Sequence, residues 1–117
     1  MNKDFYAWSA GIFEGEGTGG IWKGGVNGIQ PTIRVEMNDK KVLKELQLVF
    51  SGSLFPDMSG RKPIGKYNYN KIMWRWQITH RLALHFALTI FPYMKGRKRE
   101  ILMKIIEYYD VISRYQA

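Results

Sequence analysis

The 117-residue sequence contains no cysteine, which excludes disulfide bonds, cysteine-ligated zinc sites and thiol nucleophiles. It has only two histidines, His80 and His85, which are too few to form a histidine-rich metal or nuclease centre. No apolar run approaches the roughly 20 residues that span a bilayer. The N-terminus also lacks the basic start and apolar stretch of a signal peptide. We therefore expect an intracellular protein with no membrane partner, located in the cytoplasm or an organelle.

Acidic residues are scarce as well, with 10 Asp and Glu against 18 Lys and Arg. The formal net charge is +8 and the isoelectric point is about 9.8. This balance favours a polyanionic partner, of which nucleic acid is the default. Hydrophobic residues make up 45% of the chain, enough to bury an ordinary core, and the length suits one compact domain over residues 1–117.

The spacing of apolar residues predicts an α+β domain with one antiparallel sheet and the element order αββαββαα. Glycines and Pro92 mark the ends of helices, and Asp39 is placed to cap one. In chain order we expect a helix over 3–15, strands over 21–23 and 29–38, a helix over 39–50, a hairpin over 53–79, a helix over 80–91 and a last helix after residue 99.

Two predicted strands alternate between apolar and polar residues, so each has one buried and one polar face. Trp74 and Trp76 could stack on single-stranded bases, but their apolar neighbours favour a place in the core. The expected core positions are Ile33, Val35, Met37, Trp74, Trp76 and Ile78, and the expected polar positions are Thr32, Arg34, Glu36, Arg75, Gln77 and Thr79.

The first predicted helix carries a stripe of small residues on one arc: Ala7, Ala10, Gly11 and Gly15. Each glycine in a helix interior costs about 1 kcal/mol relative to alanine, so a compensating contact is expected. A stripe of this kind allows another backbone to approach closely. The partner is either another helix of the same subunit or the same helix of a second copy.

Glu14 and Glu16 lie near the C-terminal end of this helix, where the macrodipole disfavours a carboxylate by roughly 0.3–1 kcal/mol. Local violations of this kind are expected where function requires them. A divalent cation would reverse the penalty, since hard ions prefer carboxylate and carbonyl oxygens. The alternative is a pair of solvated acids, salt-bridged to Lys or Arg.

Residues 9–17 read SAGIFEGEG, which resembles the LAGLIDADG motif and its variant ending in GEG, with Ser9 in place of the usual Leu. The preceding Tyr6-Ala7-Trp8 and the order of elements are also similar to this family of homing endonucleases. The resemblance covers nearly the whole chain, although only the motif is diagnostic. It implies a saddle-shaped antiparallel sheet with helices on one face.

Proteins of this family with a single motif pair as homodimers, so the resemblance implies two acids side by side across a two-fold axis. The function implied is site-specific double-strand cleavage of DNA at a palindromic or pseudo-palindromic site. The alternatives on this fold are an RNA-binding intron maturase and a DNA-binding protein that does not cleave. The expected dimer interface consists of Ala7, Ala10, Gly11, Glu14 and Gly15.

The resemblance also implies a catalytic centre. Glu16, helped by the Gly15 carbonyl, would hold Mg²⁺ or Mn²⁺, with Ca²⁺ able to bind without supporting cleavage, and no small-molecule cofactor is expected. Glu14 is expected to have a structural, hydrogen-bonding role. The family has a Lys several residues after a Pro, and matching FPYMKGRKRE on Pro92 puts Arg97 at that place. The alternative for this basic run is non-specific phosphate contact.

We expect DNA contacts from the polar faces of the two hairpins, because these side chains can donate to or accept from base edges in the major groove. Basic side chains in the loops and before the last helix add phosphate or outer-base contacts. Any one of these residues could instead be a solvated part of the sheet face. The full set is Lys23, Thr32, Arg34, Glu36, Arg61, Lys62, Lys66, Arg75, Gln77, Thr79, Lys95 and Lys98.

Overall fold

The computed structural model describes residues 3–24, 28–57 and 72–116, and it confirms the α+β class and the predicted order of elements. A short 3₁₀ helix at Pro92 separates the last two α-helices, because proline cannot continue the preceding helix. The elements are α1 (Lys3–Glu16), β1 (Gly17–Trp22), β2 (Gln30–Met37), α2 (Lys40–Phe50), β3 (Ser53–Pro56), β4 (Trp74–Thr79), α3 (His80–Ile90), η1 (Phe91–Tyr93) and α4 (Arg99–Gln116).

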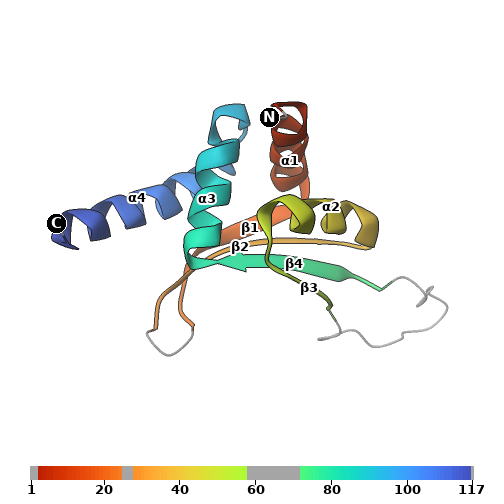
Figure 1. The fold of residues 1–117 in the computed structure, drawn as a ribbon, viewed down its shortest axis with the longest axis horizontal. Helices are drawn as coiled ribbons and strands as arrows, with labels where there is room; N and C mark the ends of the chain where they lie inside the picture. The colour runs from red at the N-terminus through yellow and green to blue at the C-terminus, as the bar shows by residue number, and fades with distance from the viewer. Residues whose placement is uncertain (1–2, 25–27, 58–71, 117) are drawn as a thin grey trace.

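The four strands form one antiparallel sheet in the order β1-β2-β4-β3. The two hairpins therefore meet through β2 and β4, which pair from Thr32↔Thr79 to Met37↔Trp74. The helices lie on one side of this sheet, and among residues 3–24, 28–57 and 72–116 no helix lies on the other side (Figure 1). β1 begins directly after Glu16, so α1 delivers the acidic end of its motif to the edge of the sheet.

The core fills the space between the sheet and the helices. The predicted core positions Ile33, Val35, Trp76 and Ile78 are confirmed as buried, whereas Met37 and Trp74 are only partly buried and pack against the core. Trp76 donates its indole N–H to the carbonyl of Ser51 at 2.8 Å, which satisfies the one polar atom of this buried side chain. Trp76 is therefore a core residue rather than a platform for stacking bases.

A local signal in the sequence explains where α2 begins. The Asp39 carboxylate accepts hydrogen bonds from the backbone N–H groups of Lys41 and Val42, which caps α2 as predicted. Leu43, Leu46 and Phe50 then face the core along one side of this helix. Among the described residues, no helix has the combination of length and apolar character needed to cross a membrane.

Candidate active site and nucleic-acid interface

Glu16 is the last residue of α1, and its side chain is exposed. Within the described part of the chain, its carboxylate has no hydrogen bond or ion pair. The last four carbonyls of a helix, including that of Gly15, lack partners within the helix. The end of α1 therefore offers hard oxygen ligands of the kind that Mg²⁺ and Ca²⁺ prefer.

One chain provides only part of a metal site. No group of three or more His, Asp or Glu side chains comes together among residues 3–24, 28–57 and 72–116. Glu16 is thus a single carboxylate with open surroundings. A complete site at this position would need ligands from outside the chain, such as a second carboxylate, water or phosphate.

Glu14 has a different role from Glu16. Its Oε1 accepts a hydrogen bond from the backbone N–H of Gly96 at 2.9 Å, and its Oε2 accepts one from the N–H of Lys98 at 3.4 Å. These contacts agree with the structural hydrogen-bonding role expected for it. The carboxylate is turned to its own chain, and the place of Glu14 in the dimer interface stays a prediction. A Cβ at Gly96 would collide with this carboxylate, which explains the glycine.

The Glu14 contacts fix the turn before α4 and place one particular cation against the motif. The Lys98 ammonium donates to the carbonyl of Gly17 at 2.8 Å, one residue beyond Glu16. Arg97 is exposed, and within the described residues its side chain has no hydrogen bond or ion pair. Alignment on Pro92 selected Arg97, whereas the folded turn brings the Lys98 side chain to the Gly17 carbonyl at the end of the motif.

The exposed face of α1 carries the small residues Ala7, Gly11 and Gly15, with the exposed side chains of Asp4 and Trp8 beside them. A Cβ built on either glycine would have no heavy atom within 4 Å outside the helix's own backbone. In the described part of the chain, no other helix covers this stripe, so packing within the subunit does not account for it. The prediction that Ala10 lies in the dimer interface is wrong, because this residue is 2% exposed and belongs to the core. The helical arc drawn from the sequence was wide enough to include this core-facing position.

The polar face of the sheet carries a row of residues in register across all four strands. Thr18 pairs with Arg34, Arg34 with Gln77, and Gln77 with Ser53. The Arg34 Nε donates to the Gln77 Oε1 at 3.0 Å, and the guanidinium carbon lies 4.9 Å from the centre of the Trp22 ring. Partial burial, and then the nearby Arg75 charge, lower the pKa of Arg34 from its ordinary value.

The next row is occupied by an ion-pair network. The Arg75 Nη2 lies 3.1 Å from Glu36 and 3.0 Å from Asp57, and its Nε also donates to Glu36. Arg75 therefore uses much of its hydrogen-bonding capacity inside the protein. Sequence patterning did not identify Asp57, because it lies just beyond β3 and outside the alternating stretches.

One predicted DNA contact is wrong for a steric reason. Thr32 is only 1% exposed, and its hydroxyl donates to the carbonyl of Gln30 at 2.9 Å. The Trp22 indole lies over Gly20, the strand neighbour of Thr32, so an aromatic ring shields a position that alternation assigned to the polar face.

The structure places the other candidates as follows. Thr79 is half-buried at the end of β4, while Lys23 and Lys95 are exposed just beyond β1 and η1. The loop candidates Arg61, Lys62 and Lys66 lie outside the described residues.

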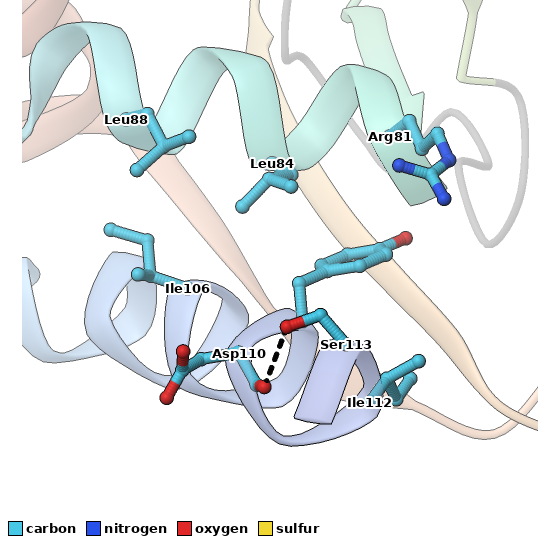
Figure 2. Close-up of a pocket in the computed structure, with 8 residues that line it drawn as sticks. Arg81, Leu84, Leu88, Ile106, Asp110, Ile112 and Ser113 are labelled. Atoms are coloured by element: carbon cyan, nitrogen blue, oxygen red, sulfur yellow. Dashed lines mark hydrogen bonds between the residues drawn. The ribbon is translucent and has the colours of Figure 1, made fainter. Parts of the chain in front are cut away.

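A groove between α3 and α4 is separate from this site. Leu84 and Leu88 of α3 face Ile106 of α4 across it (Figure 2). At one end the Ser113 hydroxyl donates to the Asp110 carbonyl at 2.9 Å. Burial is the main cause that raises the pKa of Tyr109, which also lines the groove. None of the sequence-predicted site residues lines it.

No family model matches the chain, and no curated protein sequence is similar to it. Solved structures do match. The homing endonuclease I-CvuI in complex with its target superimposes with a TM-score of 0.66 at 14% identity, over 88% of this chain and 64% of that one. The archaeal intron-encoded homing endonuclease I-Vdi141I, complexed with DNA, gives 0.63 at 15% identity, over 88% and 66%.

The LAGLIDADG homing endonuclease I-GzeII, in complex with a DNA target, gives a TM-score of 0.66 at 18% identity, over 99% of this chain and 39% of that one. The chain thus spans about two thirds of the length of I-CvuI and I-Vdi141I, and about two fifths of I-GzeII. At sequence identities this low, these structural matches establish the fold alone. The chain has the LAGLIDADG homing-endonuclease fold.

Proposed function

We propose that this protein is a site-specific, metal-dependent DNA endonuclease of the LAGLIDADG type. The observation that carries the proposal is the exposed Glu16 carboxylate, which has no partner among the described residues and lies at the end of a helix with an open face of small residues. The matching solved structures named above were determined with DNA, which supports the same class of substrate. We also propose that residues 1–117 form a single domain of this type.

A homodimer is the proposed active form. Two copies of the Ala7, Gly11 and Gly15 face could approach closely about a two-fold axis at the two glycines, which have no side chain, with the exposed Trp8 of the same face packing beside the contact. The two Glu16 residues would then lie near the axis. Doubling the formal charge of +8 would also attract a duplex, and the two polar sheet faces would each follow half of a palindromic or pseudo-palindromic site.

The metal ligands in this proposal are Glu16 and the Gly15 carbonyl of each subunit. Their oxygens suit Mg²⁺ or Mn²⁺, and one I-CvuI structure was determined with calcium and another with magnesium. When bound, such an ion would lower the pKa of the attacking water and stabilise the leaving oxygen. We propose that Ca²⁺ binds without supporting cleavage.

The protein's own side chains divide the remaining work. Lys98, held at the Gly17 carbonyl one residue beyond Glu16 in the chain, provides a positive charge that would attract the scissile phosphate and stabilise its developing charge. Glu14 keeps this basic turn against the motif through two backbone hydrogen bonds. The exposed cations Lys23 and Lys95 would contact phosphates, which adds affinity without sequence preference.

The test compares wild type with Glu16→Gln on a library of randomised DNA duplexes in Mg²⁺. We expect wild type to cut a defined site and Glu16→Gln to cut it at least about 100-fold more slowly, because the charge that holds the metal is lost. Binding of the same site in Ca²⁺ should change much less. Glu45→Gln, an exposed carboxamide change on α2, is the matched control and should cut like wild type.

Two results would contradict the proposal. Tight binding of one duplex without cleavage in either Mg²⁺ or Mn²⁺ would identify a DNA-binding protein that does not cleave. Binding of a structured intron RNA in preference to every duplex would identify an RNA-binding function instead.

A further inference from the structure

The two arginines on the polar face of the sheet have different hydrogen-bonding environments. Arg75 has its Nε and Nη2 engaged by the carboxylates of Glu36 and Asp57. Arg34 donates only through its Nε, to Gln77. Within residues 3–24, 28–57 and 72–116, the two terminal nitrogens of Arg34 have no hydrogen-bond partner.

The Arg34 guanidinium is nevertheless held in place. The Gln77 amide oxygen anchors one edge of its plane at 3.0 Å, and the Trp22 ring lies 4.9 Å from its central carbon. β2 and β4 are the two central strands, so the groups that carry Arg34 and Gln77 are supported from both sides. A guanidinium fixed in this way loses little conformational entropy when it binds a ligand.

The shape of the remaining donors selects a ligand. With Nε occupied, the terminal nitrogens present two N–H groups side by side, directed away from Gln77. In the DNA major groove, guanine alone offers two neighbouring acceptors, O6 and N7, on one base edge. A phosphate also accepts two hydrogen bonds, but the open side of the sheet is the shape that enters a groove (Figure 1).

We propose that Arg34 recognises a guanine in each half of the DNA target, with Gln77 and Trp22 as positioning residues. This inference rests on the proposed function and adds a base preference to it. Thr18, which pairs with Arg34, lies two residues after Glu16 in the chain. Arg34 is therefore at the end of the sheet nearest the acid, and the guanine belongs to the inner part of each half-site. Two-fold symmetry places the two guanines at equal distances from the centre.

The experiment selects duplexes from a library with randomised half-sites, by binding in the presence of Ca²⁺. Wild type should enrich guanine at one inner position of each half-site. Arg34→Lys keeps the charge but removes the planar fork, so guanine preference at that position should fall at least about fivefold. Preferences elsewhere in the site should persist. Arg114→Lys, an exposed change near the end of α4, is the matched control and should leave every preference unchanged.

Two further variants test positioning by Gln77. Gln77→Leu removes the acceptor for Arg34 and should weaken the same guanine preference, whereas Gln77→Glu retains an acceptor and should restore it. A purely structural role for Gln77 would lower affinity for all sites equally. Thermal unfolding of each variant identifies any that fails to fold.

A base analogue gives a direct test of the contact. Replacing the enriched guanine by 7-deazaguanine removes N7 alone, so wild-type affinity should fall at least about fivefold while Arg34→Lys affinity changes little. The inference is overturned if the protein selects a defined site and Arg34→Lys selects the same bases at every position. If wild type enriches no duplex at all, the proposed function fails, and the inference fails with it.

Discussion

Ser51 has φ 66° and ψ −159°, a combination that is almost confined to glycine. The chain adopts it because α2 must end and reverse into β3, with Gly52 at φ 100° completing the turn. The backbone N–H of Ser51 donates to the Gln47 carbonyl, and the carbonyl of Ser51 accepts a hydrogen bond from the Trp76 indole N–H. These two contacts hold the strained residue in position.

Replacing this serine by glycine should therefore stabilise the protein. We expect Ser51→Gly to raise the free energy of unfolding by about 1 kcal/mol, since the strain is relieved and both backbone hydrogen bonds remain. Chemical denaturation followed by circular dichroism would measure it. Ser53→Gly, two residues later on the exposed edge strand, should instead lose about 0.5–1 kcal/mol. Equal losses in both variants would refute the assignment of strain to Ser51.

At the same scale, the sequence predicted some residues of the candidate site and missed others. Glu16 could be identified because its motif is local. The partner of Glu14 could not, because Gly96 lies 82 residues away and the contact exists only after folding. The sequence comparison selected Arg97, but the neighbouring residue Lys98 contacts the Gly17 carbonyl. Only the hydrogen bonds of the folded turn decide which of the two side chains reaches it. Thr32 was misassigned because alternation does not show that Trp22 folds over its neighbour.

Among the elements, α1 packs one side against the core and exposes the other side to solvent. Ser9, Ala10 and Phe13 are its buried residues, while Gly11 and Gly15 look outward. Periodicity predicted most of the described helices and strands to within a few residues, because the apolar spacings of helices and strands differ strongly. It was wrong about the start of β1, which was expected at residue 21 and begins at Gly17, because a glycine-rich strand has no apolar alternation to show it. It could not fix which small residues of α1 face the core, since Ala10 and Gly11 are equally compatible with either side.

The open face of α1 gives a prediction that separates folding from assembly. A Cβ at position 11 has no heavy atom within 4 Å outside the helix's own backbone, so Gly11→Leu should fold, with unchanged or slightly higher stability. It should prevent close approach of a second α1 and raise the dimer dissociation constant at least about 100-fold, by a steric cost of a few kcal/mol. Sedimentation at several concentrations measures this.

Glu45→Leu introduces the same side chain on the exposed surface of α2 and controls for added hydrophobicity. It should sediment like wild type. If Gly11→Leu also forms the wild-type dimer, the α1 face is not the site of assembly.

For the whole molecule, the surplus of positive charge and the helix-free side of the sheet point to the same partner. The charge could be counted from the sequence and the two-sided sheet followed from alternation, so a nucleic-acid partner could be proposed before the fold was known. Charge alone does not separate affinity from specificity. Specificity depends on which arginines have N–H groups left to bind bases. Arg34 has them on its terminal nitrogens, whereas the charge of Arg75 is neutralised by Glu36 and Asp57.

The salt dependence of DNA binding measures the contribution of phosphate contacts, which is independent of base sequence. The logarithm of the DNA association constant should fall linearly with the logarithm of salt concentration, by about 0.9 for each phosphate that the protein contacts. Lys95→Ala, which removes one exposed cation from each subunit of the proposed dimer, should reduce the slope by about 1.8 and leave base preferences unchanged. Lys44→Ala removes the same charge from the exposed surface of α2, which carries neither the motif nor the basic turn before α4, and should not change the slope. If both variants reduce the slope equally, net charge rather than a defined phosphate contact governs binding, and Lys95 has no specific place in the interface.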